Sequence, residues 1–254
     1  MRFAWMGVAL ALGLVAGCAA ETAGGDASGA DGTDTAGAPP PGHVADTVVA
    51  APGQTGEGFQ DANRAVNGVR GGGETAGGSD VFSLGYRPGV DDTLVLSWGD
   101  AWVRNGDGVD FVVFENPFRT GDDRVFMDLA VVFLSRDGIT WVPFPHDYVA
   151  QDEGQYVADP AAWPGFAGRH PVRFHVDTNP VDPFDHAKAG GDPFDLDDLP
   201  SDDDAARAIR EDGFRYLKLV SAPTQINPDT GAPYVRDTAS NGPDIDGVIA
   251  RVVE

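Results

Sequence analysis

Acidic side chains are the residues of this sequence whose types and spacing point most directly to chemistry. Four short clusters place Asp, Glu or Asn beside glycine and apolar residues: residues 78–81, 105–117, 190–197 and 241–247. Calcium takes six to eight oxygens from carboxylates, amides and carbonyls, and glycine lets a backbone wrap a small ion. The clusters therefore predict bound structural calcium, with Asp80, Asp107, Asp110, Glu115, Asn116, Asp192, Asp195 and Asp244 as ligands.

A simpler interpretation of the same clusters stays open. None of them completes the spaced loop of an EF-hand, which also needs a glutamate further along the chain. Asp and Asn are also common turn-forming residues, because their side chains bond to the backbone two residues on. We expect only some of these side chains to bind a metal.

Other catalytic patterns are weak. The chain has five histidines and no HExxH motif, so zinc is not indicated, and His170 and His175 are interpreted as surface residues. There is no G-x-S-x-G motif for a nucleophilic serine. With 40 acidic residues, some carboxylate pair at a glycosidase separation is expected by chance. We therefore predict no enzyme, with a carboxylate-dependent glycan hydrolase as an alternative.

Composition excludes several classes of partner. The 254 residues carry a net charge of −23, with 17 basic residues against 40 acidic ones, so a nucleic-acid backbone would be repelled. Lys188 and Lys218 are the only lysines, which excludes a polybasic membrane patch. The 34 glycines and 19 prolines favour strands joined by turns over long helices.

The N-terminal segment predicts export and a lipid anchor. Arg2 precedes an apolar run over residues 8–15, and the sequence Val15-Ala16-Gly17-Cys18 resembles a bacterial lipobox. We predict a signal peptide at residues 1–17 and attachment to the lipid bilayer through acylated Cys18, the only cysteine. An ordinary signal peptide that removes Cys18 is the alternative. Ala19 follows the cysteine where Asp would signal inner-membrane retention, so the outer membrane is the expected location.

The rest of the chain divides into a linker and a folded domain. Residues 18–46 are rich in Ala, Gly, Thr, Asp and Pro, which predicts a disordered linker, and residues 47–254 form the domain. Hydrophobic patterns predict strands at 93–98, 109–115, 125–135, 139–144, 172–176, 214–220 and 248–253. One helix is predicted from Ser201, its N-cap, to Gly213, its end.

Two long excursions leave this scaffold, at residues 145–171 and 222–243. Segments of this length are usually functional or disordered. The first contains Trp163 and Tyr156, so it either offers a ligand platform or folds back to cover the core.

Several motifs resemble known families. Residues 129–141, with Ser135, Asp137-Gly138 and Trp141, resemble the V-x-x-S-x-D-G-x-x-W signature of discoidin-like, galactose-binding-like jelly rolls. More narrowly, residues 48–252 are similar to a family of uncharacterised bacterial cell-surface proteins and lipoproteins. The phrases DFVVFEN (residues 110–116) and AGGDPFDL (residues 189–196) carry this similarity. Trp98, Asp128 and Gly247 depart from the family pattern.

The resemblance implies an all-β, galactose-binding-like jelly-roll β-sandwich with one short helical insert. It also implies a structural calcium ion and glycan binding through loops at one end. We therefore expect a lipid-anchored, non-catalytic binding or adhesion module whose ligand is a carbohydrate stacked on Trp163 and Tyr156. The alternatives are the glycan hydrolase and a scaffold that binds another envelope protein.

Overall fold

The structure is a computed structural model, and it describes residues 43–53, 58–87, 92–122 and 124–254. The predicted signal peptide, the predicted lipidation site Cys18 and most of the predicted linker lie outside the described residues. Within the described part of the chain, no helix is long and apolar enough to cross a membrane.

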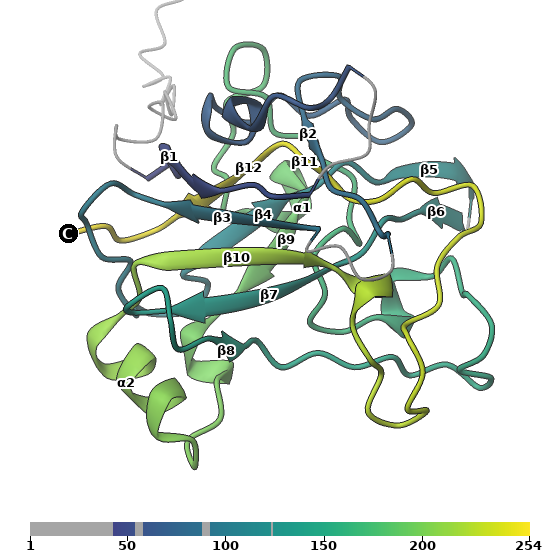
Figure 1. Cartoon of the computed structure of the whole chain (residues 1–254). Helices are drawn as coiled ribbons and strands as arrows, with labels where there is room; N and C mark the ends of the chain where they lie inside the picture. Colours follow the sequence, from purple (N-terminus) through teal and green to yellow (C-terminus); the bar gives the residue numbers. More distant parts are fainter. Residues whose placement is uncertain (1–42, 54–57, 88–91, 123) are drawn as a thin grey trace, which may run out of the picture. The chain divides into compact units, whose positions relative to one another are not determined.

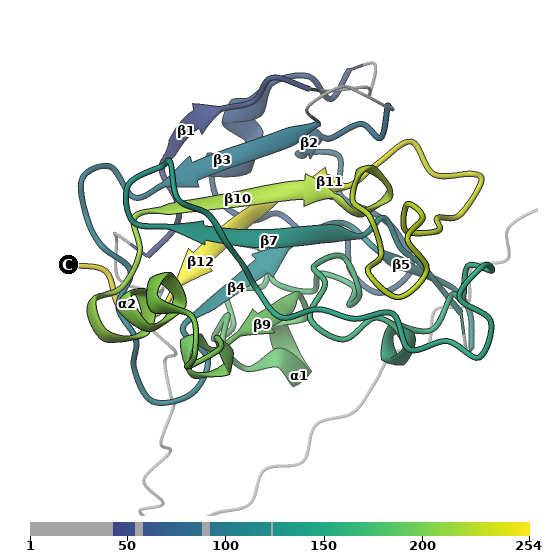
Figure 2. The same ribbon diagram turned by 60° about the horizontal axis from the view of Figure 1, so that its bottom comes forward.

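The domain is built from two antiparallel β-sheets (Figures 1 and 2). The larger sheet has the strand order β1 (Thr47–Ala50), β3 (Thr93–Ser97), β10 (Tyr216–Ser221), β7 (Ala130–Ser135) and β8 (Val142–Pro143). The smaller sheet has the order β12 (Gly247–Ala250), β4 (Phe111–Phe114) and β9 (Asp192–Phe194). Side chains from both sheets share one core, so the fold is a β-sandwich.

Shorter elements complete the domain. Two strand pairs stand outside the main sheets: β2 (Phe82–Ser83) with β11 (Asp244–Ile245), and β5 (Phe118–Gly121) with β6 (Arg124–Phe126). The helices are α1 (His186–Ala189) and α2 (Asp204–Asp212), with 3-10 turns η1 (Ala62–Val66), η2 (Pro160–Ala162), η3 (Leu196–Asp198) and η4 (Ala222–Thr224). This arrangement confirms the prediction of an all-β sandwich with a small helical part.

The central strands are apolar on both faces because both faces are covered. In β4, Phe111 and Val113 point into the core between the sheets, whereas Val112 and Phe114 pack in a second cluster with Phe174. Successive side chains of a strand point to opposite faces, so each strand contributes to two apolar layers. The outer face of the larger sheet is covered by a third cluster, in which the two long excursions pack on Val131 of β7.

Four predicted elements differ clearly from the structure, and one of them is the strand 139–144, of which only β8 forms. The predicted strand 125–135 is divided into β6 and β7 by residues 127–129. Residues 172–176 form no strand, and His175 makes isolated bridges with Arg70 and Asn179. The N-cap of α2 is Asp203, whose carboxylate accepts a hydrogen bond from Ala206 N, and not Ser201; the helix ends at Gly213 as predicted.

The folded domain begins earlier than residue 47. Val44 pairs with Ile249 of β12, Ala45 is fully buried, and Asp46 N donates to Ser97 O of β3 at 3.1 Å. The predicted linker boundary at residue 46 is therefore wrong, because residues 43–46 pair with strands of both sheets.

Candidate functional site

An open cleft of about 460 Å³ lies between the β5–β6 hairpin and the first excursion. It is lined by Arg119, Asp122, Val125, Asp159, Pro160, Ala161, Arg169 and His170. Figures 1 and 2 place β5 at the opposite end of the domain from α2 and the C-terminus. The cleft combines planar hydrogen-bonding side chains with a small apolar wall, as small-molecule sites commonly do.

Asp192 forms hydrogen bonds with two of the cleft residues, Arg169 and His170. It lies on β9, opposite Val113 of β4, and only 1% of it is exposed. Its Oδ2 accepts from Gly168 N at 2.7 Å and Arg169 N at 2.9 Å, and its Oδ1 accepts from Arg169 Nε at 3.0 Å. His170 Nδ1 lies 2.7 Å from the same Oδ1. One buried carboxylate therefore positions both Arg169 and His170.

These contacts determine the ionisation of Asp192. Burial alone would raise the pKa of Asp192, but the hydrogen bond from His170 and the positive charge of Arg169 outweigh burial and lower it. Asp192 is therefore a carboxylate. Since it can only accept hydrogen bonds, His170 carries a proton on Nδ1 and directs Nε2 away from Asp192.

The donors that Asp192 does not use are available to a ligand. Arg169 Nε is shared between Asp192 and Phe166 O, and the described residues give its two terminal Nη groups no partner. Arg119 is held on the other wall, with its Nε 2.9 Å from Oε2 of Glu74. Arg119, Arg169 and His170 thus line a cleft whose exposed Asp122 and Asp159 supply acceptors.

A second site, made of three acidic side chains, lies close to Asp192 and has a different environment. Glu115, Asp128 and Asp244 (the acid cluster) each have one buried oxygen without a hydrogen-bond partner: Oε2, Oδ1 and Oδ1 respectively. Glu115 is 2% exposed, and its Oε1 accepts from Asp244 N at 2.8 Å. Burial, followed by the charge of Asp128, raises the pKa of Glu115 well above its usual range. Burial raises the pKa of Asp128 to about 7 and also raises that of Asp244.

Gly168 separates the acid cluster from the cleft. Its N–H donates to Asp192, while a Cβ atom added to it would lie 3.2 Å from Glu115 Oε2 and 2.5 Å from Asp128 O. Its φ of +91° is one that side chains other than glycine rarely adopt. A glycine is therefore required where the backbone passes between the two carboxylate sites.

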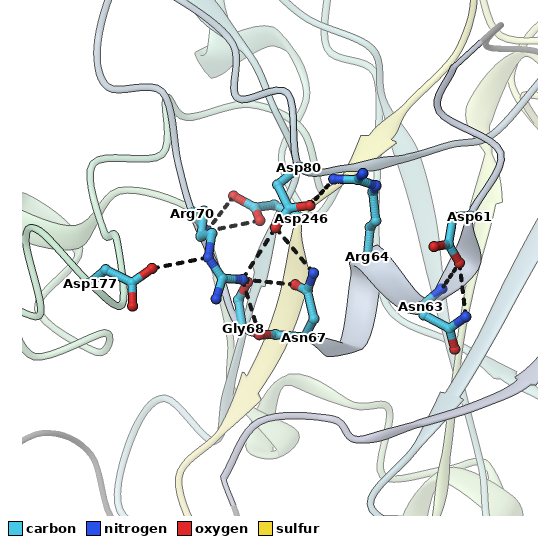
Figure 3. A network of polar contacts seen from close by, with 9 residues as sticks. All are labelled: Asp61, Asn63, Arg64, Asn67, Gly68, Arg70, Asp80, Asp177 and Asp246. Carbon is cyan, nitrogen blue, oxygen red and sulfur yellow. Dashed lines mark hydrogen bonds and ion pairs between the residues drawn. The ribbon is translucent and has the colours of Figure 1, made fainter.

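The structure brings together two of the eight predicted calcium ligands, Glu115 and Asp244, and adds Asp128, which the sequence argument missed. Asp80 instead forms ion pairs with Arg64 and with Arg70, the latter at 3.2 Å. Figure 3 shows Asp80 between these two guanidinium groups and the amide of Asn67. The charge of Asp80 is thus already compensated by protein groups.

The other predicted ligands are used in turns and buried hydrogen bonds. Asp110 accepts from the backbone N–H groups of residues 106 and 196, both at 2.7 Å, and burial raises its pKa to about 6. Asp195 caps η3, Asn116 bonds to the backbone of residue 78, and Asp107 is exposed. Among the described residues, no group of three or more His, Cys, Asp or Glu side chains is arranged to hold a metal. Calcium binding stays a prediction.

The predicted sugar platform is wrong for Trp163. This side chain is fully buried, stacks on Tyr148 with 3.7 Å between ring centroids, and donates from Nε1 to Val157 O. Tyr156 is half-buried and donates from its hydroxyl to Met127 O at 3.1 Å. Both rings belong to the cluster on the outer face of the larger sheet, so the first excursion covers the core.

Sequence reasoning also missed Arg119, Arg169 and His170. His170 was interpreted as a surface histidine, whereas it is bound to a buried carboxylate. The adjacency of Arg169 and His170 in a chain with only 17 basic residues is the signal that could have indicated them. Their connection to Asp192 depends on the fold, because 22 or 23 residues separate the partners.

The chain matches no known family model, and no curated protein matches it. Among solved structures it is similar to CBM32-1 from a family 31 glycoside hydrolase from Clostridium perfringens, at 12% identity over 81% of this chain and 93% of that chain, with a TM-score of 0.33. The assignment as a β-sandwich rests on the two sheets and their shared core.

Proposed function

We propose that this chain is an exported, non-catalytic binding module and that its cleft binds a carbohydrate. The observation that supports this most is the preorganised set of donors in the cleft, where buried Asp192 fixes both Arg169 and His170. Sugars offer many hydroxyl groups, which planar side chains such as Arg, His and Asp bind well. Rigid side chains also lose little entropy when a ligand binds.

A glycan array followed by titration calorimetry tests this proposal. The informative variant is His170→Asn, whose amide nitrogen can keep the bond to Asp192 while the Nε2 position is lost. We expect binding of the selected glycan to weaken at least ten-fold. The matched control is His175→Asn, since His175 lies outside the cleft lining. A protein that binds no glycan, or a His170→Asn variant that binds normally, would exclude this function and favour an envelope scaffold.

The carboxylates of the cleft favour binding over hydrolysis. A glycosidase needs one carboxylic acid held protonated in an apolar pocket and a second carboxylate beside it. Asp192 is instead engaged by four donor groups, and Asp122 and Asp159 are exposed. We expect no reducing ends to be released from any glycan that the protein binds. Release that His170→Asn or Asp192→Asn abolishes would establish the hydrolase instead.

Attachment to the membrane through Cys18 is part of the proposal. It is supported by the lipobox-like residues 15–18 and by the absence of any other cysteine. Cells labelled with a radioactive fatty acid should yield a labelled protein in the outer-membrane fraction. Cys18→Ser should abolish the label, and labelling that survives this change would contradict the anchor.

We also propose that calcium stabilises the domain at the acid cluster. Its three unpaired, buried carboxylate oxygens are the kind of ligand that calcium takes. Binding would have to draw Glu115, Asp128 and Asp244 closer together, because they do not form a coordination shell in the structure as it stands.

A further inference from the structure

We infer that the carbohydrate bound in the cleft is acidic and that its carboxylate lies on Arg169, His170 and Arg119. A uronic-acid oligosaccharide is the ligand class that this arrangement fits. The inference rests on the proposed carbohydrate-binding function and specifies the ligand of the same site.

The depth of the charged groups supports this assignment. The Arg169 side chain is 16% exposed and that of His170 is 31% exposed, whereas Asp122 and Asp159 are exposed residues on the rim. Arg169 and His170 therefore occupy the deeper part of the cleft, whereas Arg119, which is 47% exposed, and the two acceptors occupy its edge. A uronate matches this order, with its carboxylate directed inward and its hydroxyl groups donating to the rim.

The orientation of Arg169 supports it further. Asp192 and Phe166 O occupy the Nε side of the guanidinium, so the described residues leave both Nη groups for a ligand. The fork of an arginine matches the two oxygens of a carboxylate, and such paired bonds are stronger than neutral hydrogen bonds. Asp192 thus acts as a positioning residue for a ligand anion.

On the opposite wall, the ion pairs of the described residues give Arg119 and Arg173 one shared acidic partner. Glu74 is the acidic partner of both Arg119 and Arg173, with Oε2 on the first and Oε1 on the second. One carboxylate therefore serves two guanidinium groups beside the cleft. A ligand carboxylate would supply the second negative charge.

In a second group of arginines, each positive charge is paired with its own acidic side chain. Arg104, Arg136 and Arg215 surround the ring of Trp102 at 5.2–5.7 Å from its centroid. Each of these arginines has its own acidic partner, respectively Glu254, Asp212 and Asp100. This group has no missing negative charge, so its members serve as controls.

The test compares an acidic ligand with its own neutral ester. Titration calorimetry would use a galacturonic-acid oligosaccharide and the same oligosaccharide with every carboxylate methylated. We expect the free acid to bind at least ten-fold more tightly, with a preference that falls as salt is added. Arg119→Gln, at a side chain 47% exposed, should remove most of the preference without unfolding the protein. Arg104→Gln removes the same charge at the Trp102 group and should leave the preference unchanged.

The outcomes separate this inference from the function on which it rests. Equal binding of the acid and the ester, or a sulfated oligosaccharide that binds more tightly than any uronate, overturns the carboxylate assignment and leaves carbohydrate binding intact. Polyglutamate that binds as tightly as the uronate overturns carbohydrate binding and leaves the anion site intact. Absence of binding to every saccharide and to polyglutamate overturns both.

Discussion

The two buried carboxylate sites on either side of Gly168 have similar burial and pKa shifts of opposite sign. Asp192 is 1% exposed and is surrounded by four donor groups, which lower its pKa. Glu115 is 2% exposed, has a buried oxygen without a partner, and has acidic neighbours, which together with burial raise its pKa. The ionisation of a buried acid is therefore decided by its partners, since burial alone opposes the charge in both places. The first site is preorganised, whereas at the second the charge of Arg236 lowers the pKa of Asp128 by less than burial raises it.

Neutral isosteric substitutions should give the largest contrast between the two sites. Asp192→Asn removes a carboxylate that four donors need, so we expect the free energy of unfolding at pH 7 to fall by about 2–4 kcal/mol. Glu115→Gln removes a charge that the fold disfavours, and we expect a change within about 1 kcal/mol or a gain in stability. Urea denaturation measures both. Equal losses in the two variants would show that the sites do not differ.

Gly168→Ala tests the backbone that separates the sites. The added methyl group would lie 2.5 Å from Asp128 O at a φ of +91°, so we expect a loss of about 2–3 kcal/mol. Gly73 has the same φ of +91° and nothing within 4 Å of an added Cβ. Gly73→Ala therefore measures the backbone strain alone and should cost about 1 kcal/mol. Equal losses would show that Gly168 is not closely packed between the sites.

Calcium should affect the acid cluster and not the Asp192 site. At a calcium concentration one hundred times its dissociation constant, we expect about 2.7 kcal/mol of stabilisation over an EDTA-treated sample. For a domain of this size that is a rise in Tm of about 5–10 °C. Glu115→Gln should abolish the rise, and Asp107→Asn, which removes an exposed member of the predicted ligand set, should not. No rise in the wild type excludes calcium stabilisation, and the reverse pattern in the variants would place the site in the loops.

The smallest expected effect is a dependence of stability on pH. Burial raises the pKa of Asp128 to about 7 from an ordinary value of 3.8, so the folded protein holds a proton that the unfolded chain has released. The free energy of unfolding should therefore fall as the pH rises from about 4 to about 7, by about 1–2 kcal/mol after relaxation of the site. Asp246, whose pKa burial raises to about 7, adds to the same slope.

Urea denaturation between about pH 4 and about pH 7 checks the sign of this pH dependence and which residue causes it. Asp128→Asn should reduce the slope, because the amide does not titrate. Saturating calcium should also reduce it, since the metal competes with the proton for the carboxylates. Stability that rises with pH over the whole range would show that the carboxylates with lowered pKa, such as Asp192, dominate.

The sequence predicts the scaffold better than the sites, for physical reasons. Strands β3 and β10 follow from apolar residues that must be buried between two layers. The break between β6 and β7 could not be predicted, because residues 127–129 are as apolar as the strands around them apart from Asp128. Likewise, aromatic content alone could not show whether Trp163 faces solvent or the core.

The sequence could not show which side chains contact one another at the two carboxylate sites. Glu115 and Asp244 were both predicted as ligands, yet their contact spans 129 residues of chain. Asp128 was missed because it lies in an apolar run without a neighbouring glycine or turn signal. Asp80 and Asp192 have suitable ligand chemistry, but arginines that the fold brings to them already supply the positive charge.

The hydrogen bonds of residues 43–46 determine how the domain would respond to a pulling force. The carbonyl of His43 accepts from Ala250 N and from Trp98 Nε1, both at 2.8 Å, and Asp46 N donates to Ser97 O. A protein tethered through Cys18 and bound to a ligand at its other end would be pulled at this segment. The load would pass into both sheets at residues 43–46, so rupture would require strands of two layers to separate together. Residues 43–46 would then bear the pulling force through the hydrogen bonds that join them to both sheets.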